Sequence, residues 1–379
     1  MTEIKTTLKM ADRADDYRFM AAAIRLARRH LGETAENPSV GAIIVGTDGT
    51  TIVGHGVTET GGRPHAETQA LKMAGENARG GTAYVTLEPC SHYGKTPPCA
   101  NALINAGIKR VVISIRDPDK RVSGRGIRML EDAGIVVETG ILANQTYEGL
   151  SAYLVTRQLA RPEVTLKMAI SADNGIGVEG ERNVQISNGI SHSISHIMRA
   201  ENAAIAVGIR TVFADNPELT CRLPGLEERS PIRVVIDRKL SIGENCRLVE
   251  TAKHVPTWII AGKNVDPKKK AGLEKRGIDI FELDDTDGEF APRDILNTLY
   301  QKGISSLLLE GGRATACSFL DHGLVDRIAL FRSKLILGKK EIAAPDFSKY
   351  LVNFNKVNEA NFGEDSYSEW RCRRECLPE

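Results

Sequence analysis

Hydrophobic positions recur along this chain with two alternating periods, and this alternation predicts strands and helices in turn. A helical period over residues 15–31 places these side chains on one face: Tyr17, Met20, Ala21, Ile24, Ala27 and Leu31. Apolar runs at 41–46 and 51–56 flank a Thr-Asp-Gly turn, which is typical of a β-hairpin. Further strands are expected at 82–87, 110–115 and 135–139, with helices at 65–78, 97–107 and 124–134. The pattern predicts an α/β domain with a mostly parallel sheet and helices on both faces.

A second series of strands follows a helical segment that ends at Arg161-Pro162. We expect a first domain at 13–145, a connecting segment at 146–162 and a second α/β domain at 163–379. Strands of the second domain are expected at 164–171, 203–208, 232–237, 257–261, 305–312 and 326–337. The second domain lacks a G-x-G-x-x-G fingerprint, so an ordinary Rossmann unit is not supported.

Composition limits the classes of function. The 379 residues are 41% hydrophobic, enough for two domains that each bury a core, and the net charge of +1 indicates neither nucleic-acid nor membrane binding. The first 20 residues contain no apolar segment of the kind found in signal peptides. The seven cysteines are scattered, which favours reduced thiols in the cytoplasm over a disulfide framework.

The segment TLEPCSHYGKTPPC at 86–99 carries the chemistry of the first domain. It contains Cys90 and Cys99 in a C-x8-C spacing, and His65 and Glu67 lie upstream in a His-Ala-Glu motif. A catalytic zinc ion takes three protein ligands and leaves a position for water, and a neighbouring carboxylate can carry the proton of that water. Zinc nucleobase deaminases have an H-x-E…P-C-x-x-C signature, which is widened here. The alternatives are a closed structural zinc site with His92 as fourth ligand, or two buried thiols.

Together with DPDKRVSGRG at 117–126 and ADNPELTCR at 214–222, these motifs resemble the bifunctional riboflavin-biosynthesis deaminase/reductases. The resemblance extends from about Tyr17 into the 330s. It implies a cytidine-deaminase-like three-layer domain followed by a dihydrofolate-reductase-like domain. The first would use zinc hydroxide to remove the ring amine of 2,5-diamino-6-ribosylamino-4(3H)-pyrimidinone 5′-phosphate. The second would reduce the ribosyl group to ribityl with NADPH, giving 5-amino-6-(5-phospho-ribitylamino)uracil. A cytoplasmic homo-oligomer that binds this phosphoribosylated pyrimidine is expected, with no nucleic-acid or membrane partner.

In the first domain the resemblance assigns His65, Cys90 and Cys99 to zinc and Glu67 to proton transfer. Asn37 and Lys95 match substrate contacts, with a turn cap and a solvated loop lysine as their respective alternatives. Family members usually carry a histidine seven residues before the zinc histidine. Thr58 occupies that position here, and His55 is a candidate substitute.

In the second domain the resemblance assigns two sets of residues. The cofactor set is Ala169, Gln185, Thr211, Asp215, Gly312, Arg313, Ala314, Thr315, Ala316, Cys317 and Ser318. The substrate set is Asn183, Arg199, Leu219, Arg222 and Glu310. Gln185 replaces a family tryptophan and Asn183 replaces a family serine. The alternatives are a surface ion pair for Arg199 and for Arg222, a surface position for Arg313, and a turn before proline for Asp215.

Other conspicuous residues have simpler interpretations. His192 and His196 are four residues apart on a predicted helix and are expected on its surface. Cys372 and Cys376 are expected to be reduced, packed thiols.

Three functions therefore compete. The first is the bifunctional riboflavin enzyme, the second a tRNA or nucleobase deaminase with an accessory domain, and the third a non-enzymatic zinc module. The C-x8-C spacing, the neutral charge and the ADNPELTCR segment favour the first.

Overall fold

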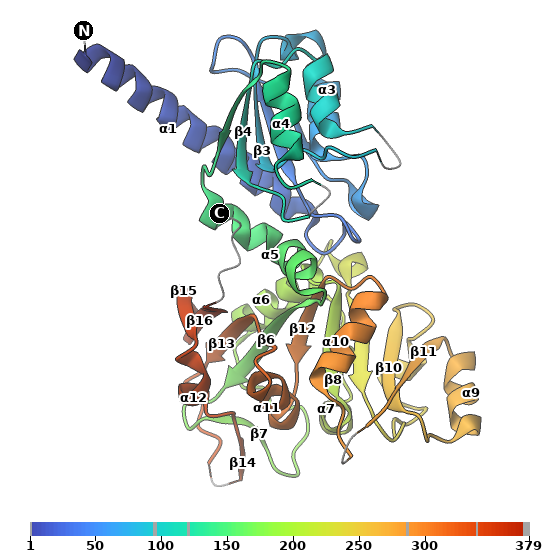
Figure 1. The fold of residues 1–379 in the computed structure, drawn as a ribbon. Helices are drawn as coiled ribbons and strands as arrows, with labels where there is room; N and C mark the ends of the chain where they lie inside the picture. Colours follow the sequence, from blue (N-terminus) through green and yellow to red (C-terminus); the bar gives the residue numbers. More distant parts are fainter. Residues whose placement is uncertain (1, 94–96, 120–121, 286–287, 339, 374–379) are drawn as a thin grey trace. The chain divides into compact units, whose positions relative to one another are not determined.

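The computed structural model describes residues 2–93, 97–119, 122–285, 288–338 and 340–373, with side chains from residue 14 onward. The chain forms two compact units, of which the first runs through Ala160 and the second begins at Arg161 (Figure 1). Both units are α/β, as the alternating pattern predicts.

The first unit contains one five-stranded sheet in the order β2-β1-β3-β4-β5. Strand β1 pairs antiparallel with β2 and with β3, whereas β3, β4 and β5 run parallel. Its elements are α1 (Thr2–Ala27), β1 (Gly41–Val45), β2 (Ile52–Val57), α2 (Ala66–Ala74), β3 (Thr82–Leu87), α3 (Cys99–Asn105), β4 (Arg110–Ile115), α4 (Arg125–Asp132), β5 (Val136–Thr139) and α5 (Ala143–Leu159). The hairpin and the helix that starts beside His65 are confirmed.

Alternating side chains of the strands divide this unit into three layers. On one face Phe19, Met20 and Ala23 of α1 pack against Ile43 and neighbouring strand residues. On the other face, α2, α3 and α4 bury apolar side chains against the residues of opposite parity in β1, β3 and β4. The expected three-layer deaminase-like architecture is confirmed.

Glycines in β2 determine how closely α2 can approach the sheet. A Cβ atom at Gly54 would lie 2.2 Å from the carbonyl oxygen of Ala70, and one at Gly56 would lie 2.3 Å from that of Ala66. Backbone therefore packs on backbone, with no side chain between strand and helix. This contact fixes the first turn of α2, which carries Glu67 and follows His65.

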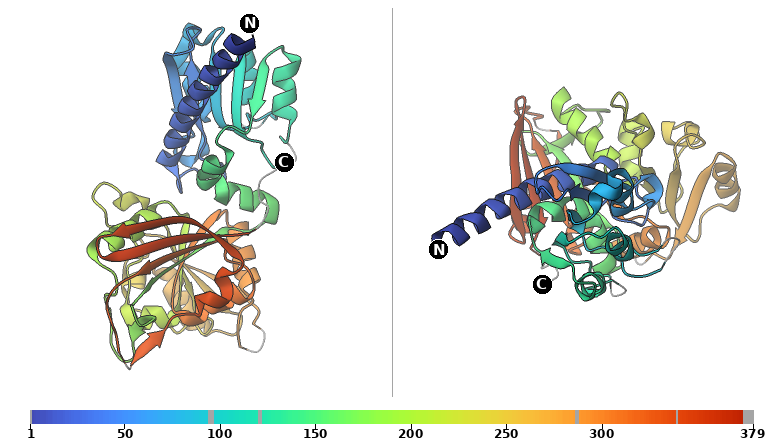
Figure 2. Two further views of the ribbon diagram at one scale, coloured as in Figure 1. Left: turned by 90° about the vertical axis from the view of Figure 1, so that its left-hand side faces the viewer. Right: turned by 90° about the horizontal axis from the view of Figure 1, so that it is seen from above.

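The second unit is built on a nine-stranded sheet in the order β11-β10-β9-β8-β12-β6-β13-β16-β15. The strands from β11 to β13 are parallel, and β16 and β15 form an antiparallel hairpin at one edge, drawn in red in Figure 2. Its strands are β6 (Glu163–Ile170), β7 (Gly175–Val178), β8 (Ala204–Gly208), β9 (Ile232–Ile236), β10 (Thr257–Gly262), β11 (Ile278–Leu283), β12 (Ser306–Glu310), β13 (Arg327–Arg332), β14 (Glu341–Ala343), β15 (Phe354–Phe362) and β16 (Asp365–Cys372). Its α-helices are α6 (Gly189–Ala200), α7 (Ile209–Asp215), α8 (Arg247–Glu250), α9 (Pro267–Lys275), α10 (Pro292–Gln301), α11 (Arg313–Asp321) and α12 (Phe347–Leu351).

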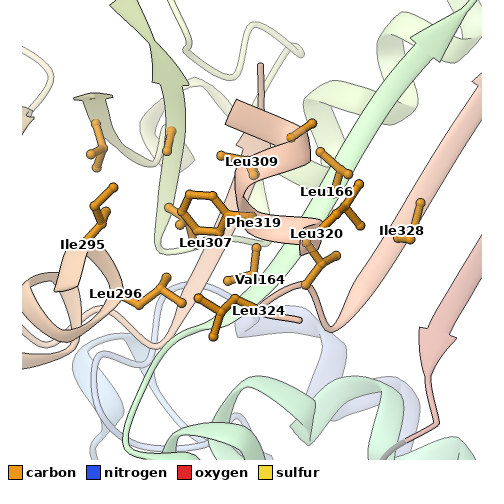
Figure 3. Packing of buried hydrophobic residues seen from close by; sticks show 14 of the residues in the cluster. Val164, Leu166, Ile295, Leu296, Leu307, Leu309, Phe319, Leu320, Leu324 and Ile328 are labelled. Carbon is orange, nitrogen blue, oxygen red and sulfur yellow. The ribbon is translucent and has the colours of Figure 1, made fainter. Parts of the chain in front are cut away.

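The largest core of this unit lies between the sheet and helices α10 and α11. Figure 3 shows Phe319 and Leu320 of α11 gathered with Leu166, Leu307 and Leu309 of the central strands. All five side chains are at most 6% exposed. The packing anchors α11 beside β12, so the short Gly311-Gly312 connection leads directly from strand to helix.

The C-terminal region differs from the sequence-based expectation. The strand expected at 326–337 ends at Arg332, because the backbone N–H groups of Leu337 and Gly338 donate to the carboxylate of Asp173 instead of continuing the ladder. The edge hairpin of β15 and β16 had no counterpart in the predicted strands. Most of β15 is exposed and polar, so it lacks the apolar pattern of the central strands.

Among the described helices, none combines the length and the apolar character needed to cross a membrane.

Replacing Gly56 by alanine is expected to disturb the first unit, because the new methyl group would clash with the backbone of α2. Overpacking of this kind costs about 1–3 kcal/mol, so the unfolding temperature of the first unit in scanning calorimetry should fall. Gly149→Ala in α5 is the matched control, since a Cβ atom there meets nothing within 4 Å. Equal unfolding temperatures for the two variants would show that the close approach is not required.

Candidate functional site

Three side chains from separate segments converge in the first unit. His65 precedes α2, Cys90 follows β3, and Cys99 begins α3. One ligand atom from each lies within 4.8 Å of the others, and this is the one such cluster of histidine, cysteine and acidic groups among the described residues. The Nδ1 atom of His65 lies 3.3 Å from the Cys99 sulfur and 3.7 Å from the Cys90 sulfur. The arrangement fits a tetrahedral metal ion with a fourth position for another ligand.

The donor chemistry of the cluster also fits zinc. The hydrogen bond from the Cys99 thiol lowers the pKa of Cys90 to about 4, and the same interaction raises the pKa of Cys99 well above its usual range. The two sulfurs therefore lie close enough to share a proton. Zinc binds cysteines as thiolates, so this pair is suited to it.

Glu67 lies beside this cluster on the first turn of α2 and is 4% exposed. Burial raises the pKa of its carboxyl group, although the nearby His65 counteracts the shift. A raised pKa makes a carboxylate a better proton acceptor, which general base catalysis requires. The position and environment of Glu67 are therefore suited to proton transfer.

The structure places the other predicted residues of this unit as follows. The side-chain amide of Asn37 packs against Gly62, where an added Cβ atom would lie 2.3 Å from the amide nitrogen, and Gly62 is three residues before His65.

Thr58 is buried, and its hydroxyl accepts the N–H of Val40, whereas His55 is exposed on β2. The proposed substitution of His55 for the missing family histidine gains no support from this geometry. Lys95 lies outside the described residues.

His92 was the alternative fourth ligand that would have closed the site. His92 does not belong to the metal-capable cluster found among the described residues. Its Nδ1 atom is buried and has no hydrogen-bond partner among these residues. The geometry therefore favours a site with three protein ligands.

The second unit contains a cavity of 1430 Å³ at the carboxyl ends of its central strands. The cavity is lined by fourteen of the sixteen residues predicted for this half: Ala169, Asn183, Gln185, Arg199, Thr211, Asp215, Leu219, Arg222, Glu310, Gly312, Arg313, Ala314, Thr315 and Cys317. Ala316 and Ser318 do not line it. Ala316 belongs to the apolar core, and Ser318 lies further along α11, where its carbonyl accepts a hydrogen bond from His322.

A buried group of three charges lies in this cavity. Arg199 donates two hydrogen bonds to Glu310, at 3.1 and 2.9 Å, and the ammonium of Lys167 lies 3.9 Å from the same carboxylate. Burial would raise the pKa of Glu310, yet the charges of Arg199 and Lys167 hold it at about 2. Arg199 is therefore no surface ion-pair residue. Lys167 was missed in the sequence, where it reads as a single polar position within an apolar strand.

Gly311 and Gly312, which follow β12, line the cavity with backbone atoms alone. Gly312 is the N-cap of α11 and has no side chain to satisfy the first N–H groups of the helix, although its own N–H donates to Thr211. Such a helix N-terminus is suited to a phosphate group. Asp215 lies nearby and accepts the N–H of Asn183, which connects the two predicted positions.

The histidine pair of α6 corrects one expectation. His196 is 3% exposed rather than on the surface, because its Nδ1 accepts the N–H of Arg222 and its ring contacts His192 at 4.6 Å. Burial, followed by the charges of Arg199 and Arg222, lowers the pKa of His196 to about 4, so the ring is neutral. No metal cluster includes either histidine among the described residues. Cys372 is partly buried at the end of β16, whereas Cys376 lies outside the described residues.

Family comparisons match both units separately. Residues 13–115 match the cytidine and deoxycytidylate deaminase zinc-binding region, which contains all three members of the metal-capable cluster. Residues 162–366 match the RibD C-terminal domain. The riboflavin biosynthesis protein RibD of Bacillus amyloliquefaciens is 42% identical over 84% of this chain and 85% of its own length. The chain belongs to the RibD family.

Other RibD proteins agree over the same extent. The Aquifex aeolicus RibD is 38% identical over 86% of this chain and 88% of its own length. The structure of Acinetobacter baumannii RibD superposes with a TM-score of 0.84 at 31% identity, covering 96% of this chain and all of that one. A Thermotoga maritima structure described as a diaminohydroxyphosphoribosylaminopyrimidine deaminase/5-amino-6-(5-phosphoribosylamino)uracil reductase gives a TM-score of 0.82 at 34% identity, over 95% and 99% of the two chains.

Membership of the RibD family decides among the three competing functions. This RibD family member is a bifunctional enzyme of riboflavin biosynthesis, with a zinc-binding deaminase domain and a reductase domain. The tRNA deaminase and the non-enzymatic zinc module are thereby excluded as whole-chain functions.

Metal analysis tests the cluster directly. The protein is expected to bind one zinc ion per chain, and Cys99→Ala should lose it, because two ligands cannot hold zinc against solvent and chelators. Cys246→Ala is a suitable control, since Cys246 is a free, partly buried thiol of the second unit. Full zinc content in Cys99→Ala after dialysis against a chelator would contradict the ligand assignment.

Proposed function

We propose that the first domain hydrolyses the ring amine of 2,5-diamino-6-ribosylamino-4(3H)-pyrimidinone 5′-phosphate. Water adds to the ring carbon, the amine leaves as ammonia, and a carbonyl remains. The proposal is supported chiefly by one observation, the convergence of His65, Cys90 and Cys99 within 4.8 Å beside the buried Glu67. The name of the Thermotoga maritima relative points to the same class of substrate.

In this proposal His65, Cys90 and Cys99 bind zinc. Zinc, when bound, supplies the Lewis acidity that lowers the pKa of water to about 7. Glu67 takes a proton from the attacking water and delivers it to the departing amine. Its burial supports this role, because the raised pKa makes the Glu67 carboxylate a better acceptor for the proton of water than an exposed carboxylate.

Asn37 is proposed to contact the pyrimidine, and Lys95 the phosphate. Asn37 is supported by its position against Gly62, next to the segment that carries His65. The Thr34 hydroxyl and carbonyl bind its backbone, which leaves the side-chain amide available for a ligand.

We further propose that the second domain uses NADPH to reduce the ribosyl group of the deaminated product to ribityl. NADPH supplies the hydride, and the protein supplies binding and orientation. The first N–H groups of α11 and the side chains of Thr211 and Asp215 line one part of the cavity and suit the cofactor. Arg222 and Glu310 line another part of the same cavity and suit the substrate phosphate and hydroxyl groups, respectively.

Glu67→Gln tests the proposed proton transfer. General acid–base groups contribute about 10²–10⁴-fold to rate, so deaminase turnover should fall by that range while zinc remains bound. Glu76→Gln, at an exposed position of the same unit, is the control. Turnover of Glu67→Gln within a few-fold of the wild type would remove Glu67 from the mechanism.

Separate assays test the assignment of the two reactions to two domains. Glu67→Ala should stop ammonia release yet still oxidise NADPH with substrate that was deaminated beforehand. Asp215→Ala or Glu310→Ala should do the reverse, so that deaminated, unreduced product accumulates. If Glu67→Ala with an intact fold by circular dichroism failed to oxidise NADPH on pre-deaminated substrate, the two-site assignment would be wrong.

A further inference from the structure

A buried carboxylate lies two residues before the metal-capable Cys90. Glu88 is 3% exposed and follows β3 directly. Its Oε2 atom accepts the N–H groups of Asp117 at 3.3 Å and Gly124 at 3.0 Å. Its Oε1 atom accepts those of Gly126 at 3.0 Å and Ile127 at 3.3 Å. One side chain therefore binds both ends of the loop that connects β4 with α4.

The fold explains why these groups meet. Strands β3 and β4 are parallel, and Leu87 pairs with Ile115, so their carboxyl ends lie side by side. The N–H of Glu88 continues the ladder by donating to Ile115 at 2.9 Å. Helix α4 begins after Gly124, which has no side chain that could cap it. The Glu88 carboxylate caps α4 instead, although Glu88 lies in a distant segment of the chain. A carboxylate is favourable at a helix N-terminus.

The peptide after Glu88 packs directly on α4. A Cβ atom at Gly126 would lie 2.1 Å from the carbonyl oxygen of Pro89, so only glycine permits this approach. On its other side, Cys90 is bound to α3, because its carbonyl accepts the N–H of Ala100 at 3.2 Å and its sulfur accepts the N–H of Cys99 at 3.3 Å. The segment from Glu88 to Cys90 is thus held between the N-termini of two helices.

We propose that Glu88 is a positioning residue of the metal site, which fixes the Pro89–Cys90 peptide against α4 and thereby sets the position of the Cys90 thiolate. The inference rests on the proposed zinc-dependent deamination. Glu88 acts through Cys90 and needs no contact with zinc or substrate. Replacing the Glu88 carboxylate by an amide leaves one acceptor oxygen instead of two. The amide nitrogen is a donor and would face backbone N–H groups, so two of these groups lose their partners.

The test compares Glu88→Gln with Asp16→Asn in the full chain. Asp16 is a matched control because it is also a buried carboxylate of the first unit, 2% exposed, and binds Arg110 and Tyr84 away from the metal-capable cluster. Zinc affinity is measured by competition with a chromophoric chelator, and the ligand geometry by the visible absorption of the Co²⁺-substituted protein. Thermal unfolding and reductase activity on deaminated substrate report on folding.

Both variants should unfold at a lower temperature than the wild type and keep reductase activity. Loss of groups that orient metal ligands typically costs about 10–100-fold in metal affinity, and this loss is expected for Glu88→Gln alone, together with altered Co²⁺ bands. Zinc affinity and Co²⁺ bands of wild-type character in Glu88→Gln would overturn the inference. So would an equal loss in Asp16→Asn, because the effect would then be one of general stability.

A second pair of variants keeps the inference testable if Glu88→Gln does not fold. Gly126→Ala leaves the carboxylate in place but pushes the Pro89 carbonyl away from α4, so it should also weaken zinc binding. Gly149→Ala, where the added Cβ atom meets nothing within 4 Å, should bind zinc as the wild type does. Unchanged affinity in Gly126→Ala would contradict the positioning role.

The failure of this inference can be told apart from failure of the proposed function. Wild-type protein that binds no zinc and releases no ammonia would overturn both. Wild-type protein that does both, beside a Glu88→Gln variant with unchanged zinc affinity, would overturn the positioning role alone.

Discussion

Parallel pairing of the central strands is the constraint on which both sites depend. Because β3 and β4 run in the same direction, the segments that follow them meet at one edge, and these segments carry Cys90 and the loop bound by Glu88. In the second unit β12 pairs in parallel with β6, which places Glu310 directly beside Lys167. Loops and helix N-termini gather at such edges, so ligand sites of open α/β sheets form there. The two halves differ in chemistry but use the same property of the parallel sheet.

Three glutamates with little solvent exposure show how the surroundings adapt one type of side chain to three different roles. Glu67 has a raised pKa because it is buried, and so it is suited to exchange protons. Glu310 is partly buried, and Arg199 and Lys167 hold its pKa at about 2, which keeps it charged. The Glu88 carboxylate accepts hydrogen bonds from four backbone N–H groups and thereby holds the loop between β4 and α4. The contrast follows mainly from the partners of each carboxylate, because all three are shielded from solvent to a large extent.

Sequence reasoning succeeded where a local pattern carries the information. The alternating apolar runs predicted the two α/β units, and the ligand types and spacing indicated a zinc site whose three side chains the fold brings together. It failed where the determining contact is distant in sequence. Lys167 lies beside Glu310 through the register of two strands far apart in the sequence, and the ring of His196 accepts the N–H of the distant Arg222. The edge hairpin was missed because β15 is largely exposed and polar.

The positions that depart from the family pattern are integrated into the fold of this chain. Thr58 is buried at 1% exposure, and its hydroxyl accepts the N–H of Val40, while its carbonyl binds the ring of His30 at 2.8 Å. Thr58 therefore links the end of β2 to the segments before β1. An imidazole ring at this position would have to make different contacts. Asn183 adopts a positive φ of 53°, which asparagine tolerates better than most residues, and its N–H binds Asp215. Gln185 is exposed, and its side-chain amide donates to the carbonyl of Ser187 at 3.3 Å, so this edge of the cavity carries polar contacts. Deeper in the same cavity, charge rather than backbone contacts joins the side chains, because Glu310 lies 2.9 Å from Arg199 and 3.9 Å from Lys167.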